Sequence, residues 1–191
     1  MPNPPRYFRL KPEMQAGNWY LGDPVDETGH EVEDIWAFTE GRPIQPAGRL
    51  TFPVREPGRR LDYSTAGVGR APIVHVRVAT LFAELAPDDV QWVPVDIEDT
   101  PEQYLLLVAT KLIRCIDNAA SREVQVWGPE DGRPEKVGQY RSVAGMRIDR
   151  TLVGGAQVFR TWGWEIALVV SEPIKRALEA AKATGAGFEE V

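Results

Sequence analysis

Two segments of equal length, residues 73–95 and 169–191, carry the same hydrophobic pattern, and they align without a gap. In each segment apolar residues recur at i, i+4, i+7, i+8 and i+11, which is the spacing of one helical face. The spacing predicts amphipathic helices at about 74–86 and 172–184. The residues of these faces are Val74, Val78, Leu81, Phe82 and Leu85 in the first segment, and Val170, Ile174, Ala177, Leu178 and Ala181 in the second.

Both helices are followed by a strand-like run, at residues 90–97 and 188–191. In the second segment Ser171 is a candidate N-cap and Gly185 lies just past the expected end. Few aligned residues are identical, so we interpret the pair as a repeated helix–strand pattern and not as proof of duplication.

The remaining chain reads mainly as strands and turns. Many strands with only two good helices predict an α+β fold with mixed or antiparallel sheets. A length of 191 residues fits one domain. We expect a part rich in strands and loops over residues 1–72, and a part rich in helices and strands over residues 73–191. Further strands are expected at residues 7–10, 19–21, 50–54, 103–109, 123–127, 158–162 and 165–170.

Charge is arranged in blocks, and the net charge is −6, with 22 Lys and Arg against 28 Asp and Glu. Residues 12–41 and 78–110 contain acids and no Lys or Arg, whereas residues 42–77 contain seven arginines and two acids. This acidic balance disfavours a nucleic-acid binder, which needs a basic footprint.

The charge blocks allow two interpretations. In the first, the arginines pair with their acidic neighbours and the surface is mixed. In the second, part of the acids form a negative face for a basic partner. The residues that the second interpretation assigns to partner binding are Asp23, Asp26, Glu27, Glu31, Glu33, Asp34, Asp88, Asp89, Asp96, Glu98 and Asp99.

Residues that commonly carry catalysis or bind metals are few. His30 lies in an acidic loop without a metal-binding motif, and the single cysteine, Cys115, lies among aliphatic residues, as expected of a buried packing residue. Residues 65–70 are glycine-rich but match no phosphate-binding motif, so we expect a tight turn. We therefore predict no catalytic residue, no metal and no cofactor. We expect most of the six tryptophans to be core residues.

Targeting signals are not evident either. Residues 1–10 lack the apolar run of a secretory signal, and the longest apolar stretch, residues 166–170, is far shorter than the ~20 residues that span a bilayer. The expected location is the cytoplasm, without a membrane partner.

The order of several short motifs resembles the bacterial polymorphic-toxin immunity proteins of family eleven. The resemblance covers roughly residues 7–191, and the ordered set is more specific than any single motif. The sequence departs from the family pattern at His75, where the family has serine. The motifs are Trp36-Ala37-Phe38 with Gly41-Arg42-Pro43, Leu61-Asp62-Tyr63, Pro72-Ile73-Val74, residues 90–95 (VQWVPV), Tyr104-Leu105-Leu106-Leu107, Cys115-Ile116-Asp117 with Ser121, and Val169-Val170-Ser171-Glu172 with Gly185, Gly187 and Phe188.

The resemblance implies a cytoplasmic α+β protein without catalytic residues, which binds and neutralises a cognate toxin in the producing cell and its kin. The toxin is expected to be encoded by the adjacent gene. Many such toxins attack nucleic acids, and an acidic inhibitor complements the basic cleft of a nuclease. Two alternatives remain: a small hydrolase or transferase that uses a carboxylate or His75, and a scaffold protein without a toxin partner.

Overall fold

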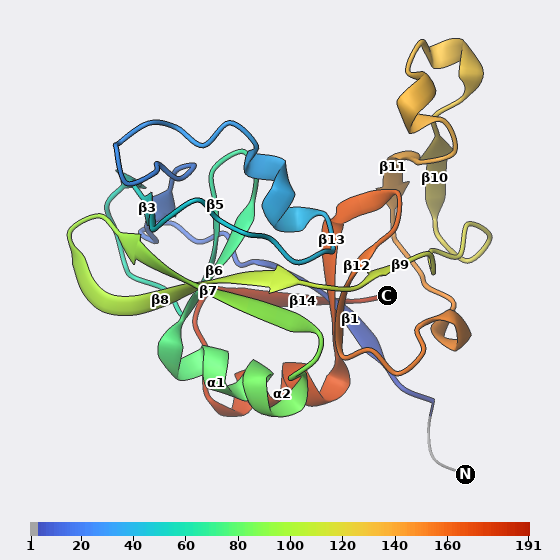
Figure 1. The fold of residues 1–191 in the computed structure, drawn as a ribbon. Coiled ribbons are helices and arrows are strands. Elements are labelled where there is room, and N and C mark those ends of the chain that lie inside the picture. The colour runs from blue at the N-terminus through green and yellow to red at the C-terminus, as the bar shows by residue number, and fades with distance from the viewer. Residues whose placement is uncertain (1–3) are drawn as a thin grey trace.

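The computed structural model describes residues 4–191, which form two five-stranded sheets with two helices packed side by side (Figure 1). The predicted α+β class is confirmed. The first sheet has the order β3 (Leu50–Phe52), β7 (Val90–Ile97), β8 (Thr100–Ala109), β6 (Ala71–His75) and β5 (Tyr63–Ala66). The second has the order β14 (Ala186–Glu190), β1 (Tyr7–Pro12), β13 (Trp164–Ser171), β12 (Val158–Thr161) and β9 (Leu112–Ile113).

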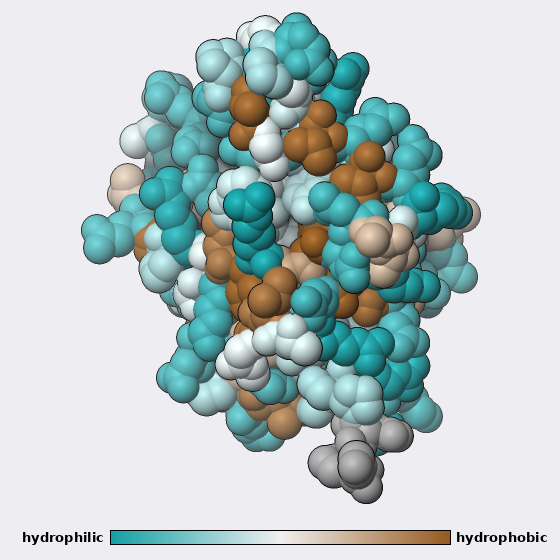
Figure 2. Space-filling model, turned by 90° about the vertical axis from the view of Figure 1, so that its right-hand side faces the viewer, coloured by the Kyte–Doolittle hydropathy of each residue, from teal (hydrophilic) through white to brown (hydrophobic). Residues whose placement is uncertain are grey.

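Smaller elements extend this framework, and the face shown in Figure 2 is mostly hydrophilic with separate apolar patches. Two two-stranded sheets pair β2 (Tyr20–Leu21) with β4 (Val54–Glu56), and β10 (Glu123–Val126) with β11 (Tyr140–Ala144). The helices are α1 (Val76–Leu85) and α2 (Glu172–Ala180). Four short 3₁₀ turns lie in connections: η1 (Ile35–Thr39), η2 (Pro129–Asp131), η3 (Pro134–Lys136) and η4 (Arg150–Leu152).

The repeated sequence pattern corresponds to a repeated topology. Strands β5-β6-β8-β7 of the first sheet and β12-β13-β1-β14 of the second have the same order, and every neighbouring pair is antiparallel. Their register also agrees: His75 pairs with Tyr104 where Ser171 pairs with Tyr7. The two halves therefore share one framework of four strands and a helix.

The halves differ in how the chain completes them. In the first, β8 directly follows β7, but in the second the equivalent position is taken by β1 from the start of the chain. The second half is thus closed by the N-terminal strand, as in a circular permutation. The helix–strand part of this repeat was predictable, whereas the contribution of β1 was not.

Helix α1 starts later than predicted, and helix α2 starts at residue 172 as predicted but ends earlier. Val74 belongs to strand β6, and α1 begins at Val76 after His75, whose Nδ1 accepts a hydrogen bond from the Arg77 amide. Ser171 occupies the N-cap position of α2, as expected, but its side chain makes no capping bond. Helix α2 ends at Ala180 and not at 184, because Lys182 adopts a positive φ of 50° that breaks the helical path.

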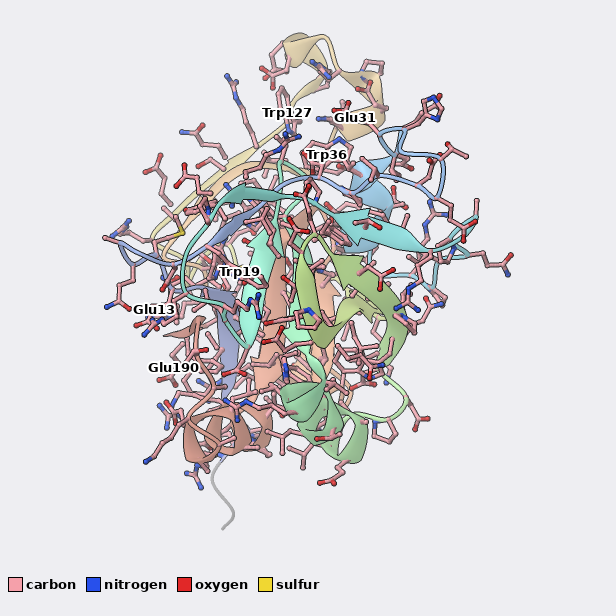
Figure 3. All side chains as sticks on the ribbon, turned by 90° about the vertical axis from the view of Figure 1, so that its left-hand side faces the viewer. Glu13, Trp19, Glu31, Trp36, Trp127 and Glu190 are labelled. Carbon is pink, nitrogen blue, oxygen red and sulfur yellow. The ribbon has the colours of Figure 1, made fainter. Side chains whose placement is uncertain are left out.

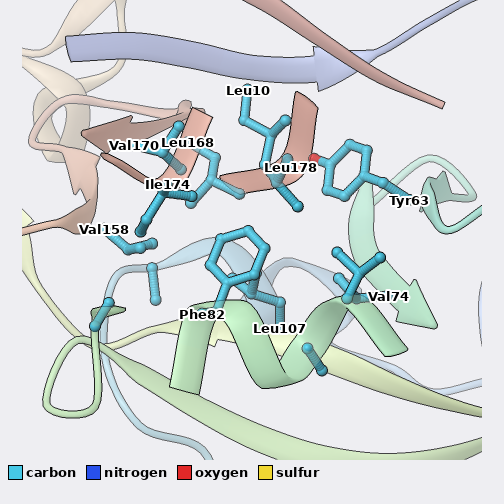
Figure 4. Close-up of a cluster of buried hydrophobic side chains, with 14 of the residues drawn as sticks. Leu10, Tyr63, Val74, Phe82, Leu107, Val158, Leu168, Val170, Ile174 and Leu178 are labelled. Atoms are coloured by element: carbon cyan, nitrogen blue, oxygen red, sulfur yellow. The ribbon is translucent and has the colours of Figure 1, made fainter. Parts of the chain in front are cut away.

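The two helices pack into a core that both sheets share. Phe82 of α1 and Ile174 and Leu178 of α2 are almost fully buried against strands of both halves (Figure 4). Burying each such side chain contributes about 1.5–3 kcal/mol. The expectation that most tryptophans are core residues is met only in part: Trp19 is buried, and Trp92 and Trp164 are half-buried and packed against core clusters. Trp36 is 54% exposed, and Trp127 and Trp162 are half-buried outside these clusters. Cations cover two of these rings, with Arg114 over Trp162 and Arg141 over Trp127.

Candidate functional site

A cavity of about 580 Å³ lies in the segment that carries the first acidic block. Its walls include four acids, and apolar side chains form much of the rest of its lining. We call it the acidic cavity. It is lined by Asp26, His30, Glu31, Val32, Glu33, Asp34, Ala37, Phe38, Leu50 and the turn residues 42–48.

Local hydrogen bonds fix the acidic wall. Oδ1 of Asp26 accepts bonds from the Thr28 amide (2.8 Å), the Thr28 hydroxyl (2.6 Å) and the His30 amide (3.0 Å), which closes a tight turn. Gly29 supplies the positive φ of 84° that the turn requires. These bonds, first those from Thr28 and His30, lower the pKa of Asp26. The carboxylate of Asp26 is therefore charged and held in place.

The opposite rim is attached to the first sheet. Gln91 of β7 bonds both the amide and the carbonyl of Ile44 at 2.8 Å, and Glu27 accepts a bond from the Arg49 amide at 2.8 Å. The loop that forms the cavity is thus held by hydrogen bonds to β7, a strand that comes later in the sequence.

Three acids of the cavity have no partner. Glu31, Glu33 and Asp34 are exposed, and among residues 4–191 no hydrogen bond or ion pair engages their side chains. The basic residue of the lining, Arg42, is paired with Glu40 just outside it. The cavity therefore has a net negative field, and Figure 3 shows Glu31 at the same end of the molecule as the exposed Trp36.

Two other acids of the first block have structural partners. Asp23 accepts bonds from the amides of Val68 (3.0 Å) and Gly69 (3.1 Å) and so holds the β5–β6 turn. That turn confirms the tight turn predicted for residues 65–70. Glu27, as described, holds the Arg49 amide.

The second acidic block does not come together as one group. Asp88 and Asp89 precede strand β7, whereas Asp96, Glu98 and Asp99 lie at its far end, about 25 Å away along an extended strand. Asp96 pairs with Arg49 through two bonds of 2.8 and 2.9 Å, and Glu98 accepts a bond from the Val54 amide at 3.0 Å. Asp88 and Asp99 are exposed.

Asp89 is a structural carboxylate and only 4% exposed. It pairs with Lys111 at 2.5 Å and accepts bonds from the amides of Gln157 (2.5 Å) and Val158 (3.1 Å) of the second sheet. Burial raises its pKa, but the bonds from Lys111, Gln157 and Val158 outweigh burial, and the resulting pKa lies below its ordinary value.

The pairing interpretation of the charge blocks is confirmed for three arginines. Besides Arg49, Arg42 pairs with Glu40 and Arg60 with Glu102. The pairs of Arg49 and Arg60 are long-range, whereas Arg42 and Glu40 are two residues apart. None of these pairs uses Glu31, Glu33 or Asp34 of the cavity. Sequence reasoning did not assign Val32 and Ile44, which lie beside these acids, to a binding surface. The available signal was the presence of apolar side chains inside a charged loop.

The candidate catalytic groups of the sequence have structural roles. His75 caps α1 and packs edge-on against Tyr104, with 5.1 Å between ring centres. Cys115 is buried, as predicted, and burial raises its pKa to about 12. Within residues 4–191 no group of three or more His, Cys, Asp or Glu is arranged to hold a metal, and no helix is both long and apolar enough to cross a membrane.

Comparison with known proteins gives one family. The sequence profile of the immunity protein family Imm11 matches residues 7–191, nearly the whole chain. No curated protein matches the chain.

Proposed function

Because the chain belongs to the immunity protein family Imm11, we propose that it binds and neutralises a cognate bacterial toxin in the producing cell and its kin. The partner is the product of the adjacent gene, and the immunity protein itself acts in the cytoplasm without catalysis. The toxin is a nuclease with a basic cleft, since a nucleic-acid site needs Lys and Arg that an acidic inhibitor can cover.

The acidic cavity is the observation that supports this mode of binding. Glu31, Glu33 and Asp34 are exposed acids whose side chains have no hydrogen bond or ion pair within residues 4–191, so complex formation breaks no ion pair there. Val32 and Ile44, both half-buried in the lining, offer an apolar surface for a central anchor of the toxin. A basic partner would be steered to the rim by charge and held by apolar contact at the centre.

Charge reversal tests this surface. The variant Glu31→Lys/Glu33→Lys/Asp34→Lys is compared with Glu13→Lys/Glu84→Lys/Glu130→Lys, which makes the same change in net charge at exposed acids outside the cavity. Glu13 lies well apart from Glu31 (Figure 3). Association of each variant with the purified product of the adjacent gene is measured at about 0.05 M and about 0.3 M salt.

For the cavity variant we expect association at low salt to slow by roughly tenfold or more, with a flattened salt dependence. The association rate of the control variant should fall much less. Equal falls in the association rate of both variants would show that only the total charge matters. Unchanged binding in the cavity variant would overturn the assignment of this surface.

The two alternatives predict different results in cells that express the toxin. The variant His30→Ala/His75→Asn/Cys115→Ala, in which asparagine can still cap α1, should protect the cells if the protein acts by binding. Lost protection in a folded variant that still binds the toxin would support an enzyme. If the wild-type chain neither binds nor protects against the neighbouring protein, the scaffold alternative is favoured.

A further inference from the structure

A cleft lined by arginines lies between the two sheets, although the protein is acidic. Its cavity of about 230 Å³ receives side chains from β1, β5, β12 and β13 and from the β5–β6 turn. We call it the basic cleft and define it by Arg9, Lys11, Arg70 and Arg160. A neighbouring cavity of about 560 Å³ shares Arg70, Arg160 and Ile166 with it and adds Trp36 and Lys136.

Arg160 of β12 is the unusual member of this group. It is 3% exposed, and its Nη1 donates to the carbonyls of Glu165 (3.2 Å) and Ile166 (3.4 Å). Its Nε and Nη2 have no hydrogen-bond partner within the described residues 4–191. Burial lowers its pKa to about 10, so the guanidinium is still charged at neutral pH. A buried charge with two unused donors is costly unless a ligand satisfies it.

The fold does not require an arginine at this position. Arg160 pairs with Leu168 across β12 and β13, and the equivalent pair in the first half is Thr65 with Pro72. Thr65 lines the same cavity from the opposite sheet. A small neutral side chain therefore serves the framework in one half, whereas the other half carries an unsatisfied cation.

The surrounding charges leave the guanidinium groups free. Among residues 4–191, Arg9 and Arg70 make no ion pair. The acid of the cleft, Glu189, is held by Lys11 at 3.0 Å, and this bond lowers its pKa. In the part of the chain that the structure describes, none of the three arginines of the cleft thus forms an ion pair with a carboxylate.

We infer that the basic cleft binds a phosphate-class oxyanion, either free phosphate or the phosphoryl group of a larger molecule that extends into the neighbouring cavity beside Trp36. Guanidinium groups bind such oxygens through paired, charge-assisted bonds. The cavity is several times the ~30 Å³ that a water molecule occupies in the liquid. Arg70 and Ile166 are exposed side chains next to Arg160, and their rotation admits the anion to its covered nitrogens.

Titration of the whole chain with inorganic phosphate tests this inference, by calorimetry and by thermal unfolding against chloride at equal ionic strength. Phosphate also stabilises proteins by exclusion from their surface. The comparison therefore includes Arg70→Gln and Arg160→Gln, with Arg55→Gln as the control, an exposed arginine outside the cleft. Since Arg160→Gln perturbs a buried site, the folding of this variant is checked by circular dichroism. If Arg160→Gln is unfolded, the test depends on Arg70→Gln alone.

We expect saturable binding of phosphate to the wild-type chain and to Arg55→Gln, with affinity reduced about tenfold or more in Arg70→Gln, as loss of a charge-assisted contact predicts. A second titration with adenosine 5′-monophosphate separates the two sources: tighter binding than phosphate indicates a phosphoryl group on a larger molecule, and equal or weaker binding indicates free phosphate. No saturable binding of either probe, or equal binding by Arg70→Gln and wild type, would overturn the inference. The test uses no toxin, so its outcome is independent of the function proposed above.

Discussion

The adjacent acids Asp88 and Asp89 are expected to differ sharply in their effect on stability. Asp88 is exposed, whereas Asp89 connects the start of β7 to Lys111 and to the backbone of β12. Replacing Asp89 by asparagine keeps the shape and removes the charge. The same replacement at Asp88 is the matched control, one residue away.

The size of the effect follows from the contacts that are lost. The Lys111 side chain is 43% exposed, so its ion pair with Asp89 is worth about 0.5–1 kcal/mol. The amides of Gln157 and Val158 keep an oxygen acceptor but lose its charge, which costs about 1 kcal/mol each. We expect Asp89→Asn to lower the free energy of unfolding by about 2–3 kcal/mol, or the melting temperature by about 4–12 °C, and Asp88→Asn to change it by less than about 0.5 kcal/mol.

The pH dependence gives a second, independent measurement. The folded-state pKa of Asp89 is lowered, so its contribution is fully present above the unfolded value of about 3.9 and is lost as the pH falls through the lower folded value. Urea unfolding at a series of pH values should therefore show the gap between Asp89→Asn and wild type closing in acid. A gap below about 0.5 kcal/mol at neutral pH, or a gap that persists at low pH, would refute this account of Asp89.

Three further predictions rest on the contacts of single residues. Asp62→Asn weakens the bonds of 2.7 and 2.5 Å with Arg77, and we expect urea unfolding to show a loss of about 2 kcal/mol. Cys115 should not react with Ellman's reagent at pH 8 in the folded protein, because it is buried and its pKa is raised to about 12; rapid reaction before unfolding would contradict this. Gly185→Ala places a Cβ against a backbone carbonyl at a φ of 85° and should destabilise far more than Gly132→Ala, which has a φ of 68° and open space, when the two melting temperatures are compared.

The local parts of the fold were predictable because their causes are local. The strand at residues 90–97 was predicted with its bounds, and Gly67 in the short β5–β6 turn has the positive φ that glycine allows. The prediction of where α1 starts was wrong because Val74 fits both a strand pattern and a helix pattern. It continues the apolar run of β6 and also falls on the spacing of the helical face. Periodicity alone cannot separate these two states at a junction.

The candidate site was predictable only as a composition. The charge blocks of the sequence indicated which segments are acidic. Arg49 and Asp96 form their ion pair across 47 positions, however, and no local signal indicates which acid has a partner. Asp88 and Asp89 are identical side chains in neighbouring positions. Their difference depends on Lys111 and on strand β12, whose Val158 is 69 positions away from Asp89. Arg160 lies within the strand expected at residues 158–162, and a single arginine in a strand carries no sequence pattern that indicates a binding site.

The two halves of the fold together show which features demand a functional explanation. Both halves contain the same four strands and helix in the same register. The need to fold is therefore a sufficient explanation of this shared framework. The acidic cavity lies in residues 26–50, outside the shared elements, and Arg160 stands where the first half has Thr65. Substitutions of the carboxylates that hold this framework through ion pairs, such as Asp89 and Asp62, should therefore reduce stability. Changes at Glu31 or Arg70 should instead alter binding at constant stability. The two sites carry opposite charge and use different side chains, so each can be removed while the other is kept.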